Sequence, residues 1–241
     1  MVDNARKKKQ LEKIIESSIR VFSARGYRQA QMSQIAQEAG IAPGTLYLYF
    51  GSKESLFNFL LRYIFSGEQS LDAISIPIKS SSWGLGITSG KDAFVSSKLS
   101  AVIENAIRKR EVMDIHQEFE KIINSLFFTM ATYRHGITIL LQSSLNWPEL
   151  ADFYVSIIKN LVETLTVYLD ERINQGLIRK VPNVSASARF ILDTIAWFAV
   201  HRHRAMHQSI ISEKVAEETV VDALVHAFIP QSLRRLPRTE V

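Results

Sequence analysis

The sequence predicts an all-α protein, with a small N-terminal three-helix domain joined by a fourth helix to a larger helical domain. Three observations support this class. Apolar residues recur every three or four positions, no segment shows the alternation of a half-buried strand, and glycine and proline separate the helical stretches. We expect domains over residues 1–52 and 53–230, followed by a basic tail over 231–241.

The N-terminal domain begins with two apolar stripes of helical spacing. The first covers residues 11–22 and ends at Gly26, because glycine tolerates the left-handed backbone that closes a helix. The second covers residues 32–39, about two turns, and stops at Gly40. A helix, a short helix and a glycine turn are the opening of a helix-turn-helix motif.

A third helix is expected to start at Pro43, because the fixed φ angle of proline suits the first position of a helix. Leu46 and Phe50 lie four residues apart on it, so both should pack on the first two helices. Ser52 can then cap a fourth helix, whose apolar face covers residues 56–64.

The larger domain follows from about residue 72. Glycine and serine residues make 76–90 a predicted loop, which we interpret as a surface loop rather than a lid over a ligand entrance. The role of the whole 75–114 segment is open. Helices are then expected over residues 94–107, 148–175, 184–206 and 212–228, with a long apolar-rich stretch over 115–145.

Composition and the absence of known motifs exclude several classes of function. With 46% hydrophobic and 22% charged residues among 241, the chain has an ordinary globular composition. It contains no cysteine, which excludes disulfides and thiolate chemistry, and no glycine-rich phosphate loop, GxSxG or HExxH motif. We expect no enzymatic activity and no cofactor. Without a signal peptide or a long apolar run, a soluble cytoplasmic protein with no membrane association is expected.

Positive charge is concentrated at the N-terminal end. The formal net charge is +5, and residues 1–60 contribute nine Lys/Arg against five Asp/Glu, which is +4. The other 181 residues carry 20 against 19. A basic end of this kind suits a polyanion such as nucleic acid, although charge alone fits a solubilising segment equally well.

The third helix carries residue types suited to a DNA groove. Gly44 allows close backbone approach, and Thr45 offers a hydroxyl and a methyl group to base edges. Tyr47 and Tyr49 can each donate a phenolic hydrogen bond to phosphate. Lys53, in the first turn of the fourth helix, can meet a phosphate together with free backbone N–H groups. A core role for the tyrosines and a solvated Lys53 are the alternatives.

Residues 11–64 resemble the DNA-binding domain of TetR-type (tetracycline-repressor-like) transcriptional regulators. The resemblance covers roughly a fifth of the chain. The matching elements are Phe22, Gly26-Tyr27, Ile35-Ala36, Ala39-Gly40-Ile41, Gly44-Thr45-Leu46-Tyr47-Leu48-Tyr49-Phe50 and Lys53-Glu54-Ser55-Leu56.

The resemblance implies a homodimer that binds double-stranded DNA at a palindromic operator and is released by a small-molecule inducer. It also implies DNA contacts from Ser33 on the second helix and from five later residues, namely Gly44, Thr45, Tyr47, Tyr49 and Lys53. Two positions depart from the family pattern: Gln31 replaces the threonine that usually opens the second helix, and Ala42 replaces a serine or threonine.

The resemblance further implies that the last two long helices form a four-helix bundle across a two-fold axis. Burial of large apolar side chains from each subunit would stabilise this dimer, with a core within one chain as the alternative. The expected interface residues are Phe190, Ile191, Ile195, Phe198, Val221, Leu224, Val225 and Phe228.

Aromatic and methionine residues of the larger domain are candidates for an inducer cavity, although such residues at helical spacing are more often ordinary core. Few ionisable groups interrupt them, so an apolar inducer is preferred. The candidates are Phe119, Phe127, Met130, Tyr133, Trp147, Phe153, Tyr154 and Trp197.

The histidine pair His203 and His207 has the four-residue spacing of a helical metal site. Arg202 and Arg204 would repel a cation, so we interpret this segment as a polar helix end and expect no metal.

The sequence therefore predicts a homodimeric, ligand-responsive repressor. A constitutive DNA-binding regulator or architectural protein without a ligand is the alternative. These residue patterns specify no particular inducer, operator or regulated gene, and they fit repression and activation alike.

Overall fold

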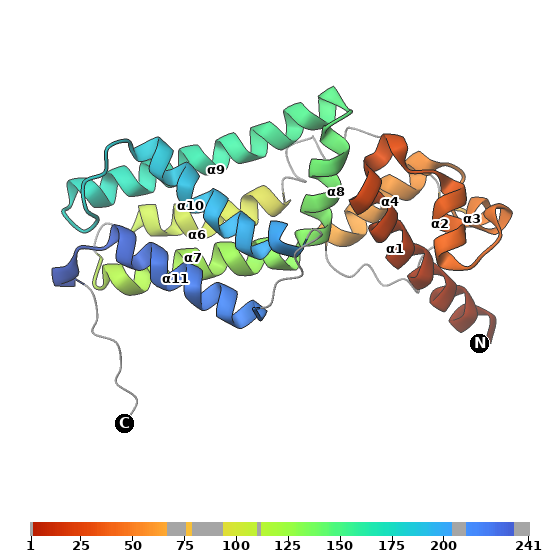
Figure 1. Cartoon of the computed structure of the whole chain (residues 1–241), viewed down its shortest axis with the longest axis horizontal. Coiled ribbons are helices and arrows are strands. Elements are labelled where there is room, and N and C mark those ends of the chain that lie inside the picture. Colours follow the sequence, from red (N-terminus) through yellow and green to blue (C-terminus); the bar gives the residue numbers. More distant parts are fainter. Residues whose placement is uncertain (1, 67–75, 79–93, 110–111, 204–210, 234–241) are drawn as a thin grey trace. The chain divides into compact units, whose positions relative to one another are not determined.

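The computed structural model describes residues 2–66, 76–78, 94–109, 112–203 and 211–233 (Figure 1). Within these residues the chain is helical, and its β-structure is limited to one isolated bridge between Phe50 and Ile78. The all-α prediction is confirmed. The predicted loop over 76–90 lies almost entirely outside the described residues.

The chain forms two compact units. One contains residues 1–94 and 135–155, and the other contains residues 95–134 and 156–241. The expected boundary at residue 52 does not coincide with this division, because later helices complete the core of the N-terminal unit.

The N-terminal unit begins with α1 (Val2–Gln29), α2 (Met32–Ala39), α3 (Pro43–Tyr49) and α4 (Lys53–Ser66). α2 ends at Gly40 in a left-handed conformation, and α3 starts at proline as predicted. Figure 1 shows α1, α2 and α3 close together, the arrangement of a helix-turn-helix domain.

Gly26 interrupts the regular backbone of α1, with a φ angle of 68°. A Cβ atom at this position would lie 2.6 Å from the carbonyl oxygen of Gln142. Glycine is therefore required twice here, for its backbone conformation and for the close approach of a distant segment.

That distant segment consists of α8 (Arg134–Ser144) and the start of α9 (Pro148–Asn174). The Trp147 ring lies 4.7 Å from the Tyr27 ring and 6.3 Å from the Phe57 ring, and Phe57 packs edge-on against Phe22 at 5.1 Å. The backbone N–H of Tyr27 also donates to Ser143 Oγ at 3.0 Å. Aromatic packing of this kind fixes the end of α1.

The second unit contains α6 (Phe94–Arg108), α7 (Ile115–Thr132), the rest of α9, α10 (Val184–Ala199) and α11 (Glu213–Phe228). Side-chain caps start three of these helices, with Asp114, Asn183 and Ser212 each accepting from a backbone N–H. α7, α10 and α11 pack on one another. α10 is shorter than predicted and is followed by a 3-10 turn, η2 (His201–His203). A second 3-10 turn, η3 (Gln231–Leu233), follows α11.

A buried cation lies inside this second unit. Arg172 is fully buried, and its Nε donates to Glu118 Oε1 at 2.9 Å while its Nη2 donates to the carbonyl of Ala106 at 2.6 Å. The Tyr168 hydroxyl donates to the same carboxylate oxygen at 3.2 Å. Burial, together with the charge of Glu118, raises the pKa of Tyr168, so it stays a neutral donor.

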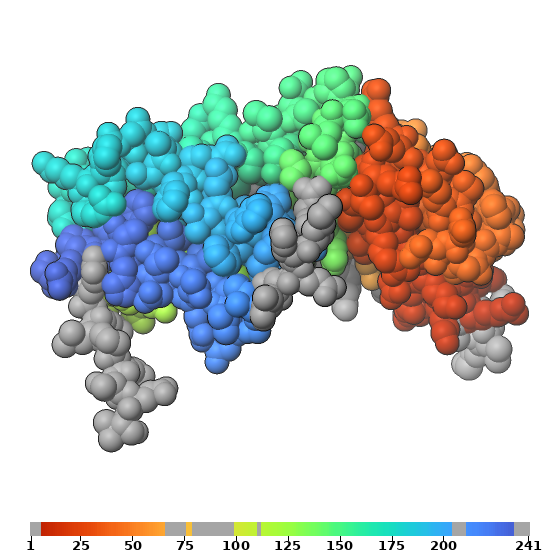
Figure 2. Space-filling view, in the orientation of Figure 1, coloured from red at the N-terminus to blue at the C-terminus, as the bar shows by residue number. Residues whose placement is uncertain are grey.

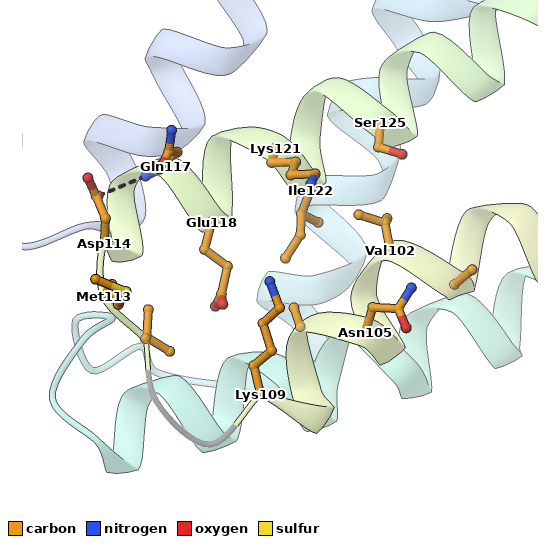
Figure 3. A pocket seen from close by; sticks show the side chains of 13 residues that line it. Val102, Asn105, Lys109, Met113, Asp114, Gln117, Glu118, Lys121, Ile122 and Ser125 are labelled. Carbon is orange, nitrogen blue, oxygen red and sulfur yellow. Dashed lines mark hydrogen bonds between the residues drawn. The ribbon is translucent and has the colours of Figure 1, made fainter.

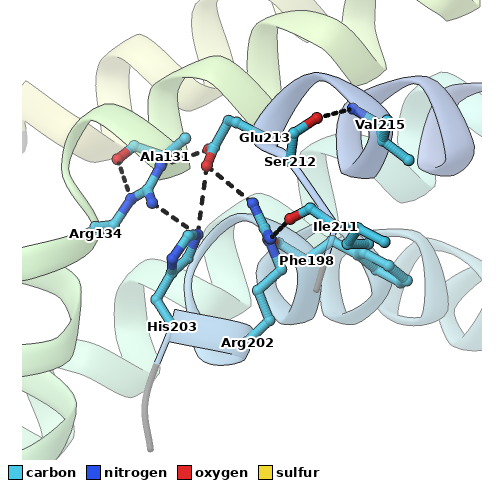
Figure 4. A network of polar contacts seen from close by, with 9 residues as sticks. All are labelled: Ala131, Arg134, Phe198, Arg202, His203, Ile211, Ser212, Glu213 and Val215. Atoms are coloured by element: carbon cyan, nitrogen blue, oxygen red, sulfur yellow. Dashed lines mark hydrogen bonds and ion pairs between the residues drawn. The ribbon is translucent and has the colours of Figure 1, made fainter. Parts of the chain in front are cut away.

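A polar network joins Arg134, the first residue of α8, and the turn η2 to the start of α11 (Figure 4). Glu213 accepts from Arg134 at 2.5 Å and from Arg202 at 2.9 Å, and its carboxylate lies 3.4 Å from His203. Burial and the two arginines lower the pKa of His203. The network agrees with a polar helix end; His207 lies outside the described residues.

No helix within the described segments is long and apolar enough to cross a membrane. Those segments also contain no group of three or more His, Cys, Asp or Glu arranged to hold a metal ion.

Candidate nucleic-acid interface

The exposed face of α3 is the candidate DNA-contacting surface. Leu46 and Phe50 are fully buried, as their four-residue spacing predicted. Gly44 is exposed, Thr45 is half-buried, and Tyr47 is 51% exposed. The structure therefore leaves three of the predicted contact residues accessible on α3, with Thr45 partly covered.

Tyr49 does not lie on this surface. It is only 6% exposed, and its hydroxyl donates to Gln10 Oε1 of α1 at 3.1 Å. The physical reason is helical geometry: Tyr49 is three residues after Leu46 and therefore points to the same buried side. Its expected role at a phosphate does not match this placement.

Lys53 is also occupied within the protein. Its ammonium donates to the carbonyls of Tyr27 at 2.9 Å and Ala30 at 3.0 Å, and it lies 4.6 Å from the centre of the Tyr27 ring. A third carbonyl, of Arg28, lies 3.4 Å away. These contacts use all three protons of a lysine, so Lys53 holds the end of α1. Burial lowers its pKa.

On α2, Ser33 is exposed and accessible to a DNA backbone, as expected. Gln31, the departure from the family pattern, is accommodated because the Gln34 side chain accepts from the Gln31 backbone N–H at 3.1 Å. α2 therefore begins without the usual threonine.

Leu48 is a surface residue that the sequence analysis did not single out. It is 69% exposed on the same side of α3 as Tyr47. The signal was available, because Leu48 is two residues from both Leu46 and Phe50 and so points away from the core. An exposed leucine here can contact the methyl group of a thymine.

The predicted inducer-site residues are not brought together. Phe119, Phe127, Met130 and Tyr133 belong to the core of the second unit, and the Phe119 ring lies 5.9 Å from that of Phe228. Trp147, Phe153 and Tyr154 pack against the N-terminal core, and Trp197 is 60% exposed.

A groove between α6 and α7 instead forms a pocket of about 790 Å³ (Figure 3). Its walls combine apolar groups such as Val102 and Ile122 with polar ones. Figure 3 shows Lys109, just after the end of α6, and Glu118 of α7 directed into the space from opposite sides. Arg172 neutralises Glu118, whereas Lys109 and Lys121 have no acidic partner among the described residues. The groove therefore favours an amphipathic ligand with a negative or polar group.

The predicted dimer residues divide into two groups. Ile191, Ile195, Leu224, Val225 and Phe228 are buried within the single chain, which is the intrachain alternative. Phe198 and Val221 are half-buried, and Phe190 is 57% exposed. Trp197, seven residues after Phe190, adds a second exposed aromatic side chain to the same side of α10.

Comparison with known proteins agrees with this geometry. The family model described as "Bacterial regulatory proteins, tetR family" matches residues 14–60, which covers most of α1 through α4. Residues 14–60 therefore resemble the DNA-binding segment of tetR-family regulators. The comparisons support a TetR-type DNA-binding transcriptional regulator, and the curated relatives that match are themselves named as regulators.

One relative extends beyond the helix-turn-helix. The fatty acid metabolism regulator protein of Bacillus subtilis (strain 168) is 27% identical over 184 residues, which are 76% of this chain and 77% of the relative. The uncharacterised HTH-type regulator YvdT of the same organism is 49% identical over 45 residues, which are 19% of this chain and 23% of YvdT.

Solved structures of low identity share the fold. The ketosteroid transcriptional regulator KstR2 of Mycobacterium tuberculosis has a TM-score of 0.61 at 15% identity, covering 92% of this chain and 96% of KstR2. The TetR-family regulator PfmR of Thermus thermophilus has a TM-score of 0.53 at 20% identity, covering 92% of this chain and 99% of PfmR.

Proposed function

We propose that this TetR-family regulator is a homodimeric repressor that binds a palindromic operator through α3 and releases it when a small ligand occupies the α6–α7 groove. The observation that carries the DNA-binding part is the division of α3 into a buried side and an accessible side. Leu46, Tyr49 and Phe50 anchor the helix, and Thr45, Tyr47 and Leu48 are presented outward.

Each presented side chain has a distinct chemical task. The Tyr47 hydroxyl can donate to a phosphate oxygen, which positions the protein without reading sequence. Thr45 and Leu48 offer methyl groups to thymine, and Thr45 adds a hydroxyl for a base edge. Ser33 supplies a further hydroxyl from α2. Tyr49 and Lys53 support the surface from within.

Selection of bound duplexes from a random library tests this proposal. A two-fold dimer should select a palindrome whose half-sites lie about one helical turn, roughly 34 Å, apart. Thr45→Val and Leu48→Ala should change the preferred bases, since a lost base contact costs about 1–3 kcal/mol. Tyr47→Phe should weaken binding to every sequence alike. Val167→Ala, an exposed site in the second unit, is the control.

An unchanged base preference in both Thr45→Val and Leu48→Ala would contradict the assignment of α3 as the reading helix. Recovery of single, unpaired half-sites would contradict the dimer. The exposed side chains of Phe190 and Trp197 support the proposal of a homodimer, because large aromatic side chains are enriched at protein interfaces.

The groove between α6 and α7 supports the proposal that a small ligand binds the protein. Its volume lies within the range of small-molecule sites, roughly 300–1,000 Å³. The purely apolar inducer preferred from sequence is replaced in this proposal by an amphipathic one, with its apolar part against Val102 and Ile122. The name of the Bacillus subtilis relative directs the first trials to fatty acyl compounds.

Release of operator DNA by fatty acyl compounds of increasing length tests the groove. Val102→Trp should fill it and abolish release while leaving DNA binding intact, and Val167→Trp serves as the matched control. Release that survives Val102→Trp would place the ligand elsewhere. Absence of any response or thermal stabilisation would favour the constitutive regulator.

A further inference from the structure

Three cations share one face of the first turns of α1. Arg6, Lys9 and Lys13 follow one another at three- and four-residue spacing, so they lie on one side of the helix, and all three are exposed. No described residue forms an ion pair with any of them. Residues 1–13 hold five Lys/Arg against two acidic residues.

This part of α1 is anchored. Leu11 and Ile14 are buried in the N-terminal core, at 3% and 0% exposure, so the turns that carry Lys9 and Lys13 are fixed by packing. Figure 2 shows the dark red residues of α1, from about residue 6 onward, at the surface of the N-terminal unit. A cation on a packed helix loses less freedom on binding than one on a flexible tail.

A hydrogen bond joins the same turns to the end of α3. The Tyr49 hydroxyl donates to Gln10 Oε1 at 3.1 Å and lies 3.5 Å from the carbonyl oxygen of Lys7. Gln10 is the immediate neighbour of Lys9. The basic turn of α1 therefore lies directly beside the helix that presents Thr45, Tyr47 and Leu48.

We propose that Arg6, Lys9 and Lys13 form a phosphate-binding stripe that contacts the DNA backbone beside the groove entered by α3, and that Tyr49 positions it. The partner is the sugar-phosphate backbone, so the contact carries no base preference. A merely solubilising role would not require a basic turn attached to the reading helix. The inference rests on the proposal that α3 binds DNA. It does not depend on whether the protein binds a ligand or forms a dimer.

Salt dependence measures these contacts. Each phosphate neutralised by a cation releases counterions, so log K falls with log salt by about 0.9 per contact. The triple variant Arg6→Gln/Lys9→Gln/Lys13→Gln should reduce that slope by about 2–3. Its affinity at low salt should fall at least tenfold on the selected operator and on an unrelated duplex, with the preferred bases unchanged.

The matched control is Lys159→Gln/Lys180→Gln/Lys214→Gln, which removes the same charge from exposed sites of the second unit. Its slope should stay close to that of the unmodified protein. Equal slopes for the two triple variants would overturn the proposal, whether they are both unchanged or both reduced. Circular dichroism and melting show that each variant is folded.

Tyr49→Phe tests the positioning role, because it keeps the ring and removes only the hydroxyl. We expect the slope of log K against log salt to fall by about 0.9, the value for one phosphate contact, and the base preference to stay unchanged. Gln10→Leu should reproduce both effects. A loss of affinity without a change in slope would overturn the positioning role. The assignment of α3 as the helix that reads the bases is tested separately. If that assignment is wrong, Thr45→Val and Leu48→Ala will leave the base preference unchanged.

Discussion

Two embedded cations, Arg172 in the second unit and Lys53 in the N-terminal unit, are satisfied differently. Arg172 in the second unit is fully buried against a carboxylate, a tyrosine and a carbonyl. Lys53 in the N-terminal unit is only half-buried and is held by carbonyls and an aromatic ring, with no carboxylate among its contacts. Loss of a partner is therefore costly in the second unit, whereas the N-terminal unit keeps its cation near water.

This contrast fits the two proposed tasks. In the second unit, the ion pair connects α9 to α7 and the end of α6, the two helices that line the groove. In the N-terminal unit, Lys53 fixes the chain between α1 and α2 and leaves the outer face of α3 free. The first arrangement stabilises a pocket wall, and the second stabilises a reading surface.

The largest expected effect comes from breaking the buried pair. Glu118→Ala would leave the Arg172 charge uncompensated, so we expect a loss of about 3–5 kcal/mol in the free energy of unfolding. Urea denaturation measures this. The control Glu104→Ala breaks an exposed pair with Arg108, 3.8 Å long, and should cost about 0–1 kcal/mol. Similar losses for both variants would contradict the contrast.

A smaller effect is expected at Lys53. Lys53→Met keeps the stem but leaves carbonyl groups unpaired, so we expect a loss of about 1–3 kcal/mol. The salt dependence of DNA binding should not change, because the ammonium is committed within the protein. A reduced slope with unchanged stability would restore the sequence-based interpretation of Lys53 as a phosphate contact.

The smallest effect concerns His203. Its pKa is lowered in the folded protein, so the unfolded chain binds more protons as pH falls through its usual value near 6.5. The folded state should therefore lose stability as the pH falls through about 6.5 toward the lowered pKa of the folded protein. Melting temperatures of the unmodified protein and His203→Gln measure this, and His203→Gln should show a smaller loss. An equal loss in both would exclude His203 as its source.

Sequence patterns predicted the helix-turn-helix well, because its signals are local. Gly40 and Pro43 mark the helix ends through their own backbone preferences, and Leu46 and Phe50 reveal the buried side of α3. Tyr49 was misplaced because its phenol suits phosphate as well as a core position. Its spacing from Leu46 distinguishes the two.

The second unit was less predictable because its decisive features are tertiary. Apolar residues such as Ile191 and Leu224 serve a dimer or a single-chain core equally well, and only the packed structure shows the latter. Arg172 follows two acidic residues, Asp170 and Glu171, and has the sequence context of a surface residue. Its burial depends on Glu118, 54 positions earlier.

The completion of the N-terminal unit by residues 135–155 has a consequence for its biosynthesis. When α4 emerges from the ribosome at residue 66, Tyr27 and Phe57 still lack Trp147, and Gly26 lacks its neighbour Gln142. At about 5–20 residues per second, roughly 4–16 s of translation pass before those partners arrive. During that interval the nascent helix-turn-helix exposes an unfinished aromatic core, so chaperone capture at this length is the expected mark of its synthesis.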